Sequence, residues 1–94
     1  MNIPEVIKVG GVLYKVVFTH DISESETWTG CCVFSKQEIR IKPDMGKEYT
    51  EEVFCHELVH AIAKQATVEF GEHEEVIVDS LGKVLQQVLN DNKF

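Results

Sequence analysis

Two histidines and a glutamate near the middle of the chain have the spacing of a metal site. His56, Glu57 and His60 form the motif HExxH, in which two imidazoles lie four residues apart and a carboxylate directly follows the first. On an α-helix this spacing places both histidines on one face, where their rings can bind the same zinc ion. Glu57 would point beside the metal at an attacking water molecule. The motif therefore predicts a hydrolytic site, with His56 and His60 as zinc ligands and Glu57 as the general base.

The segment that carries the motif has the composition of a helix. Residues 51–66 contain no Pro or Gly, Thr50 precedes them as a candidate N-cap, and the first turn carries Glu51 and Glu52, which the helix dipole favours there. Apolar residues recur at intervals of three and four: Val53, Phe54, Leu58, Ala61 and Ile62. We therefore expect the two histidines to lie beside an apolar face. The alternative interpretation is a helix whose histidines make only ordinary hydrogen bonds.

The size and charge of the chain restrict its other functions. Its 94 residues are enough for one domain, residues 1–94, with a modest core that a bound metal could help to stabilise. The net charge of −7 and the scattered basic residues argue against a nucleic-acid partner. The sequence has neither an apolar run of membrane-spanning length nor a signal peptide at its N-terminus. We therefore expect a cytoplasmic protein without a membrane partner.

The cysteines are also consistent with a cytoplasmic location. Cys31, Cys32 and Cys55 are odd in number and form no CxxC pair, which favours reduced thiols over a disulfide framework. Cys55 directly precedes His56 and so points about 100° away from it around the predicted helix. We therefore expect the cysteines to be packing residues and not metal ligands.

The first half of the chain is predicted to form a sheet. Four segments have the composition or alternation of strands: residues 6–9, 12–20, 28–34 and 37–42. The first pair flanks Gly10 and Gly11, which favour a tight hairpin turn, and the second pair flanks Ser35 and Lys36. After Pro43 the chain becomes helical. The predicted fold is α+β: a small antiparallel sheet of about four strands followed by two long antiparallel helices.

The second predicted helix, residues 72–90, is the expected source of a third metal ligand. A reversal at residues 67–71 would pack the two helices antiparallel and bring the start of the second one to the histidines. This helix carries an apolar stripe of Ile77, Val78, Leu81, Val84, Leu85, Val88 and Leu89. A catalytic zinc usually has three protein ligands and one open position, so an acidic residue of this helix is expected to complete the site.

HExxH with an acidic ligand on a following helix resembles the gluzincin branch of the zincin metallopeptidases, and very small single-domain zincins of bacteria and phages look like the nearest kin. The family's spacing falls on Asp79, with the small residue Gly82 three positions later. The resemblance therefore implies Asp79 as the third ligand, although the family has Glu there. The alternative ligand is Glu75, with Asp79 then holding a histidine ring by its second nitrogen. Both acids would also suit a solvated helix face.

The resemblance implies a zinc-dependent peptidase that hydrolyses a peptide or protein substrate. In zincins an edge strand above the active-site helix binds substrate, and residues 37–42 are a candidate for it, or for a plain sheet strand with one wet face. The alternative function is a non-catalytic metal-binding protein, regulatory or structural, with a zincin-like fold. Glu57 favours catalysis, because a structural zinc needs four ligands and no base. Two imidazoles and a carboxylate also accept other divalent ions.

Overall fold

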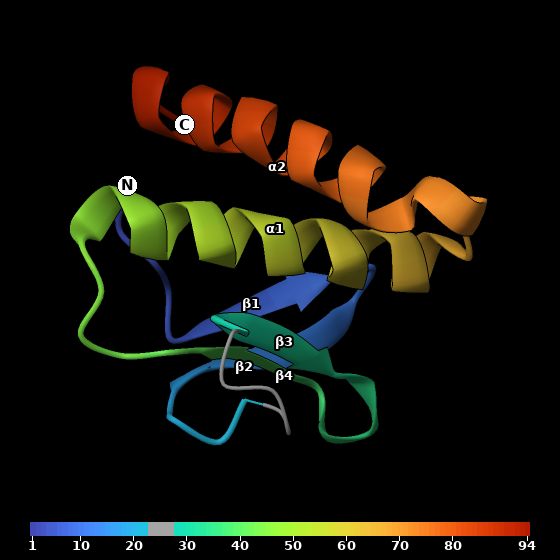
Figure 1. Cartoon of the computed structure of the whole chain (residues 1–94), viewed down its shortest axis with the longest axis horizontal. Helices are drawn as coiled ribbons and strands as arrows, with labels where there is room; N and C mark the ends of the chain where they lie inside the picture. The colour runs from blue at the N-terminus through green and yellow to red at the C-terminus, as the bar shows by residue number, and fades with distance from the viewer. Residues whose placement is uncertain (23–27) are drawn as a thin grey trace.

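The chain forms a four-stranded sheet followed by two long helices, in a computed structural model that describes residues 1–22 and 28–94. The strands are β1 (Val6–Val9), β2 (Val12–Phe18), β3 (Gly30–Val33) and β4 (Glu38–Ile41). The helices are α1 (Lys47–Ala66) and α2 (Glu74–Asp91), and two short 3₁₀ turns are η1 (Phe34–Lys36) and η2 (Gly71–His73). Figure 1 shows the two helices antiparallel, with α1 between α2 and the sheet. The α+β class predicted from the sequence is confirmed.

β1 and β2 form the predicted hairpin. Gly10 and Gly11 have φ angles of 58° and 83°. A two-residue hairpin turn requires such positive φ angles, and glycine adopts them without strain. The two strands pair antiparallel, with Val9 opposite Val12 and Ile7 opposite Tyr14. The turn contacts the end of α1, because a Cβ on Gly10 would lie 2.7 Å from Gln65 Cβ. The hairpin thereby fixes where α1 ends over the sheet.

The sheet is mixed, with the strand order β1-β2-β4-β3, so the predicted wholly antiparallel sheet is wrong in one pair. β3 and β4 pair antiparallel as predicted, but β4 runs parallel to β2, with Val16 opposite Ile39 and Phe18 opposite Ile41. Ile39 and Ile41 are fully buried, and a central position gives their strand the apolar cover of α1. β4 therefore lies inside the sheet, and β3 is the edge strand beside it.

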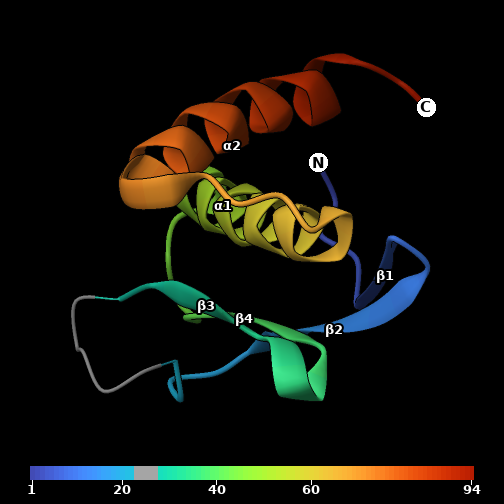
Figure 2. The same ribbon diagram turned by 90° about the vertical axis from the view of Figure 1, so that its right-hand side faces the viewer.

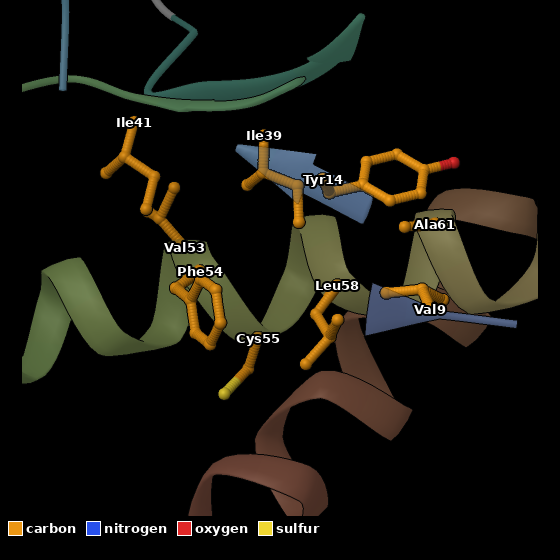
Figure 3. Close-up of a cluster of buried hydrophobic side chains, with 9 residues drawn as sticks. All are labelled: Val9, Tyr14, Ile39, Ile41, Val53, Phe54, Cys55, Leu58 and Ala61. Atoms are coloured by element: carbon orange, nitrogen blue, oxygen red, sulfur yellow. The ribbon is translucent and has the colours of Figure 1, made fainter. Parts of the chain in front are cut away.

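α1 is the centre of the molecule, because both the sheet and α2 pack against it. Figures 1 and 2 both show it between these two layers. In Figure 3, Ile39 and Tyr14 project from the sheet toward α1, whereas Cys55 and Leu58 project from α1 on the side of α2. A helix covered on two sides needs apolar residues around most of its circumference. This explains why the apolar residues of α1 are spread over more than one face.

The start of α1 differs from the prediction. Thr50 was expected as the N-cap, but α1 begins one turn earlier, after Gly46, which is its N-cap residue. The Thr50 hydroxyl instead donates a hydrogen bond of 2.8 Å to the Gly46 carbonyl oxygen within the first turn. A threonine inside a helix commonly bonds the carbonyl four residues back, so the same side chain serves either position.

α2 packs against α1 with a narrower contact than its apolar stripe predicts. Only Val78 and Gly82 of this helix are buried, while Leu85 and Leu89 are partly buried against the core. Leu81 and Val84, which belong to the predicted stripe, are largely exposed. The contact with α1 therefore runs along one line of α2, from Gly82, which lies against His56, to Leu85 and Leu89 nearer the end of the helix. No helix in the described part of the chain has the length and apolarity needed to cross a membrane.

Candidate metal centre

His56 and His60 lie on the face of α1 that α2 approaches, one helical turn apart. Both are partly buried, and their ring centroids are 5.1 Å apart with the ring planes inclined by 64°. The Nε2 atoms of the two rings converge on one carboxylate of α2. His56 Nε2 lies 3.0 Å from Glu75 Oε2, and His60 Nε2 lies 2.9 Å from Glu75 Oε1. The helical spacing predicted from the motif therefore brings both rings to one point.

These three residues have the donor atoms that a zinc ion prefers. One ligand atom from each of His56, His60 and Glu75 lies within 4.8 Å of the other two, and among the described residues they are the only such group. Zinc bonds of about 2.0–2.1 Å in a tetrahedral arrangement place ligand atoms roughly 3.3 Å apart, close to the two contact distances found. The donor set therefore fits zinc, and three donors leave a fourth position open.

Asp79 takes a different place from the one that the family resemblance implies. Its Oδ1 atom lies 3.9 Å from His56 Nδ1, and its Oδ2 atom forms an ion pair of 3.2 Å with Lys83, one turn along α2. The first distance is too long for a hydrogen bond. Asp79 thus lies behind the ring nitrogen that faces away from Glu75. This arrangement favours Glu75 over Asp79 as the third ligand, while the predicted hydrogen bond by which Asp79 would hold a histidine ring is not formed.

Gly82 explains how α2 comes close enough for Glu75 to reach the histidines. A Cβ on Gly82 would lie 3.2 Å from both the backbone N and the Cα of His56. The absence of a side chain therefore lets the two helix backbones nearly touch at the first histidine. Glu75 lies seven residues before Gly82, which is two helical turns, so the two residues share one face of α2. The packing that buries Gly82 also turns Glu75 toward the metal centre.

Glu57 is set back from the histidines in the wall between α1 and β3. Its side chain is 7 % exposed. Burial raises the pKa of its carboxyl above the usual value, and this outweighs the opposing influence of His56 and His60. The Cys32 thiol donates a hydrogen bond of 3.1 Å to the Glu57 backbone carbonyl. Glu57 is thus a buried carboxylate beside two imidazoles, a suitable position for a proton acceptor.

Two residues that shape this wall were missed in the sequence. Gly30, the first residue of β3, has its Cα so close to α1 that a Cβ would lie 2.6 Å from Val53 Cγ1 and 3.2 Å from Glu57 Cγ. Cys32, two residues along the strand, contacts the backbone of Glu57. A glycine within an apolar strand indicates that another backbone passes close by, and this signal could have located the contact. No comparable signal pointed to Cys32.

An open cleft of about 700 Å³ lies over the metal centre. Residues 28–32 line one side of it, at the edge of the sheet, and side chains of α1 and α2 line the other. The predicted edge strand, residues 37–42, does not border the cleft, because β4 lies inside the sheet. Within the described sheet, β3 has a strand neighbour on one side only, and it borders the cleft. β3 is thus the strand that has the edge position expected of residues 37–42.

Comparisons of the chain with protein-family models, with curated proteins and with solved structures found no match. The resemblance to gluzincins therefore depends on the HExxH motif and on the acidic residues of the second helix.

Proposed function

We propose that the protein is a zinc-dependent peptidase. The observation that carries this proposal is the convergence of His56 Nε2 and His60 Nε2 on the two carboxylate oxygens of Glu75, at 3.0 and 2.9 Å, beside the buried carboxylate of Glu57. Glu75 replaces Asp79 as the third ligand in this proposal, and Asp79 lies beside the ring of His56, 3.9 Å from its Nδ1 atom. The arrangement provides three ligands, one open position and one base, which is the usual composition of a hydrolytic zinc site.

Each residue has a separate task in the reaction. His56, His60 and Glu75 hold the metal, and zinc, when bound, supplies a Lewis acid that polarises a peptide carbonyl and lowers the pKa of a water molecule. Glu57 accepts the proton of the attacking water on its carboxylate and then donates it to the leaving amine. Burial favours the first step, because a carboxylate whose pKa is raised is a stronger base than an exposed one.

The substrate is proposed to be a peptide in an extended conformation. β3 pairs with β4 along one side only, so backbone groups on its other side are free of strand partners within the described sheet. An extended peptide can add to such an edge through main-chain hydrogen bonds, and here it would cross the cleft over the metal centre. The cytoplasm is the location we propose, which the three free thiols of the chain support.

The first test is the metal content of the purified, untagged protein by elemental mass spectrometry. We expect near-stoichiometric zinc in the wild type, a large loss in Glu75→Ala and a smaller loss in Asp79→Ala. Glu72→Ala is the matched control, because Glu72 is an exposed acid just before α2 and lies outside the metal cluster. Protein that takes up no transition metal even when zinc is supplied at neutral pH would refute the proposal.

The second test separates catalysis from metal binding alone. Cleavage of a mixed peptide library is followed by mass spectrometry for the zinc-loaded wild type and for Glu57→Gln. We expect cleavage that falls by at least about a hundredfold in Glu57→Gln while the zinc content is unchanged. A protein that binds stoichiometric zinc and cleaves no peptide would instead be the non-catalytic metal-binding protein that the sequence left as the alternative.

A further inference from the structure

The side chains around the cleft are acidic and aromatic, which indicates what kind of peptide it binds. Five carboxylates line it, and among the described residues no Lys or Arg does. The acids are Glu52, Glu57, Glu74, Glu75 and Asp79. A divalent metal would offset only two of these five negative charges. We propose that the cleft selects peptides with a lysine or arginine next to the bond that is cleaved, an inference that rests on the proposed peptidase function.

Glu52 is the residue to which we assign this selection. It lies on α1 one turn before His56 and lines the cleft, but it is neither a ligand nor the base. Its side chain is partly buried and has no ion pair or hydrogen bond within the described residues. A partly buried carboxylate without a cationic partner interacts more strongly with an incoming charge than an exposed one does. Glu52 is therefore placed to bind the cation of a substrate.

Two aromatic side chains at the same end of the cleft add to this preference. Trp28 and Tyr49 both line it, and each is about half exposed, so their rings are accessible to a ligand. Tyr49 lies on α1 one turn before Glu52, so the ring and the carboxylate adjoin each other. Lysine and arginine side chains pack favourably on such rings through their alkyl stems and through cation–π attraction. A neutral aliphatic side chain would gain the packing but not the electrostatic attraction.

The opposite end of the cleft contains a lysine as well as acids, which distinguishes it from the Glu52 end. Lys64 lies on α1 one turn beyond His60 and stands over the ring of Phe34, with its Nζ atom 5.5 Å from the ring centroid. It lines a second, adjoining hollow that shares Phe34, His60 and Glu74 with the first and that also contains Glu69. Along α1 the order is therefore a carboxylate, the two histidines and then an ammonium group. A basic side chain is favoured on the Glu52 side of the cleaved bond, where no lysine or arginine among the described residues lines the cleft.

The test measures binding by the fluorescence of Trp28, which is the single tryptophan of the chain and lines the cleft. Blocked neutral peptides that contain one lysine, or norleucine at the same position, are titrated into zinc-loaded Glu57→Gln and into the metal-free protein. Norleucine matches the shape of lysine without its charge. Glu52→Gln is tested in the same background, and Glu48→Gln is the control, because Glu48 is an exposed acid on α1 outside the cleft.

We expect the lysine peptide to bind roughly five- to tenfold more tightly than the norleucine peptide, and this ratio to fall below about twofold in Glu52→Gln but not in Glu48→Gln. The ratio should also shrink as the salt concentration rises. Equal binding of the two peptides, no detectable binding of either, or a ratio unaffected by Glu52→Gln would overturn the inference.

Cleavage is measured in parallel with the wild type. Cleavage without a lysine preference leaves the peptidase proposal intact and refutes this inference, whereas a Glu52-dependent lysine preference without cleavage refutes only the peptidase.

Discussion

The contact between β3 and α1 at Gly30 sets the position of Glu57, and it can be tested by adding one methyl group. In Gly30→Ala the new Cβ would lie 2.6 Å from Val53 Cγ1, 3.1 Å from the Arg40 carbonyl oxygen and 3.2 Å from Glu57 Cγ. Carbon atoms in good contact are about 3.5–4.0 Å apart, so the nearest contact must open by about 1 Å. The backbone of Arg40 in the neighbouring strand limits movement in the other direction.

The expected cost follows from two opposing effects. Overpacking of this kind in a dense core destabilises a protein by about 1–3 kcal/mol. Gly30 does not have a positive φ angle, so alanine fits its backbone. Alanine also lowers the conformational entropy of the unfolded chain, which stabilises the folded protein by about 0.4–1 kcal/mol. We therefore expect Gly30→Ala to lower the free energy of unfolding by about 1–2 kcal/mol. For a domain of this size that corresponds to a fall in Tm of about 5–15 °C.

The assay is denaturant unfolding of a double-mutant cycle. Val53→Ala removes the Cγ1 atom that makes the closest contact, so it should relieve part of the strain in the double variant Gly30→Ala/Val53→Ala. We expect the double variant to be more stable than the sum of the two single effects predicts, by about 1 kcal/mol. Strictly additive effects, or a Gly30→Ala protein as stable as the wild type, would show that β3 does not press on α1 at this point.

Three further predictions concern other contacts. Gly82→Ala should lower the zinc affinity about tenfold, because the added methyl group holds α2 away from the histidines. The free energy of unfolding should change by less than about 1 kcal/mol, because alanine favours the helix. Titration with a competing chelator measures the affinity, and Ser80→Ala on the exposed side of α2 is the control. Burial raises the pKa of Cys55 to about 11 and also that of Cys32, so alkylation of both at pH 8 should be roughly a hundredfold slower in the native than in the unfolded protein; equal rates by mass spectrometry would contradict this. Burial alone would raise the pKa of Glu51, but its hydrogen bonds and nearby positive charges outweigh burial and lower the pKa below 4.5. The ionised Glu51 carboxylate therefore stabilises the folded protein above pH 4.5, and this stabilisation is lost as the pH falls through the lowered pKa. The stability advantage of the wild type over Glu51→Gln, about 1 kcal/mol at pH 7, should therefore disappear on acidification, and an advantage that persists at pH 2 would contradict the assignment.

Local sequence patterns predicted the helices and strands, whereas the error in the sheet concerned which strands pair with each other. Gly10 and Gly11 identified the first hairpin, because the positive φ angles of its turn depend on those two residues alone. The parallel pair of β2 and β4 depends instead on which side of the second hairpin docks beside β2. Alternation in residues 38–42 is compatible with an inner or an outer strand, so the sequence left β4 as a candidate edge strand. Its central position follows from the complete burial of Ile39 and Ile41.

At the candidate metal centre, too, local geometry was predictable and the packing of a second element was not. His56 and His60 were predicted from one helical turn, and their rings converge because that geometry is local. The assignment of the third ligand depends on how α2 is rotated and how far it is shifted along α1. Spacing favoured Asp79, but the close approach at Gly82 turns Glu75 to the rings and leaves Asp79 beside His56 Nδ1. Spacing along one chain does not fix the rotation of a second helix.

A metal at the candidate site would add to the packing between α1 and α2. Val78 and Gly82 are the fully buried residues of α2, Leu85 and Leu89 are partly buried against the core, and Leu81 and Val84 are about half exposed. A metal held by two residues of α1 and by Glu75 would tie the helices together at the point where their backbones are closest. At a free zinc concentration of 100 times the Kd this linkage is worth about 2.7 kcal/mol, which is comparable to burying a further large side chain. In a chain of this size, a metal that completed the site would thus also strengthen the packing of α2 on α1.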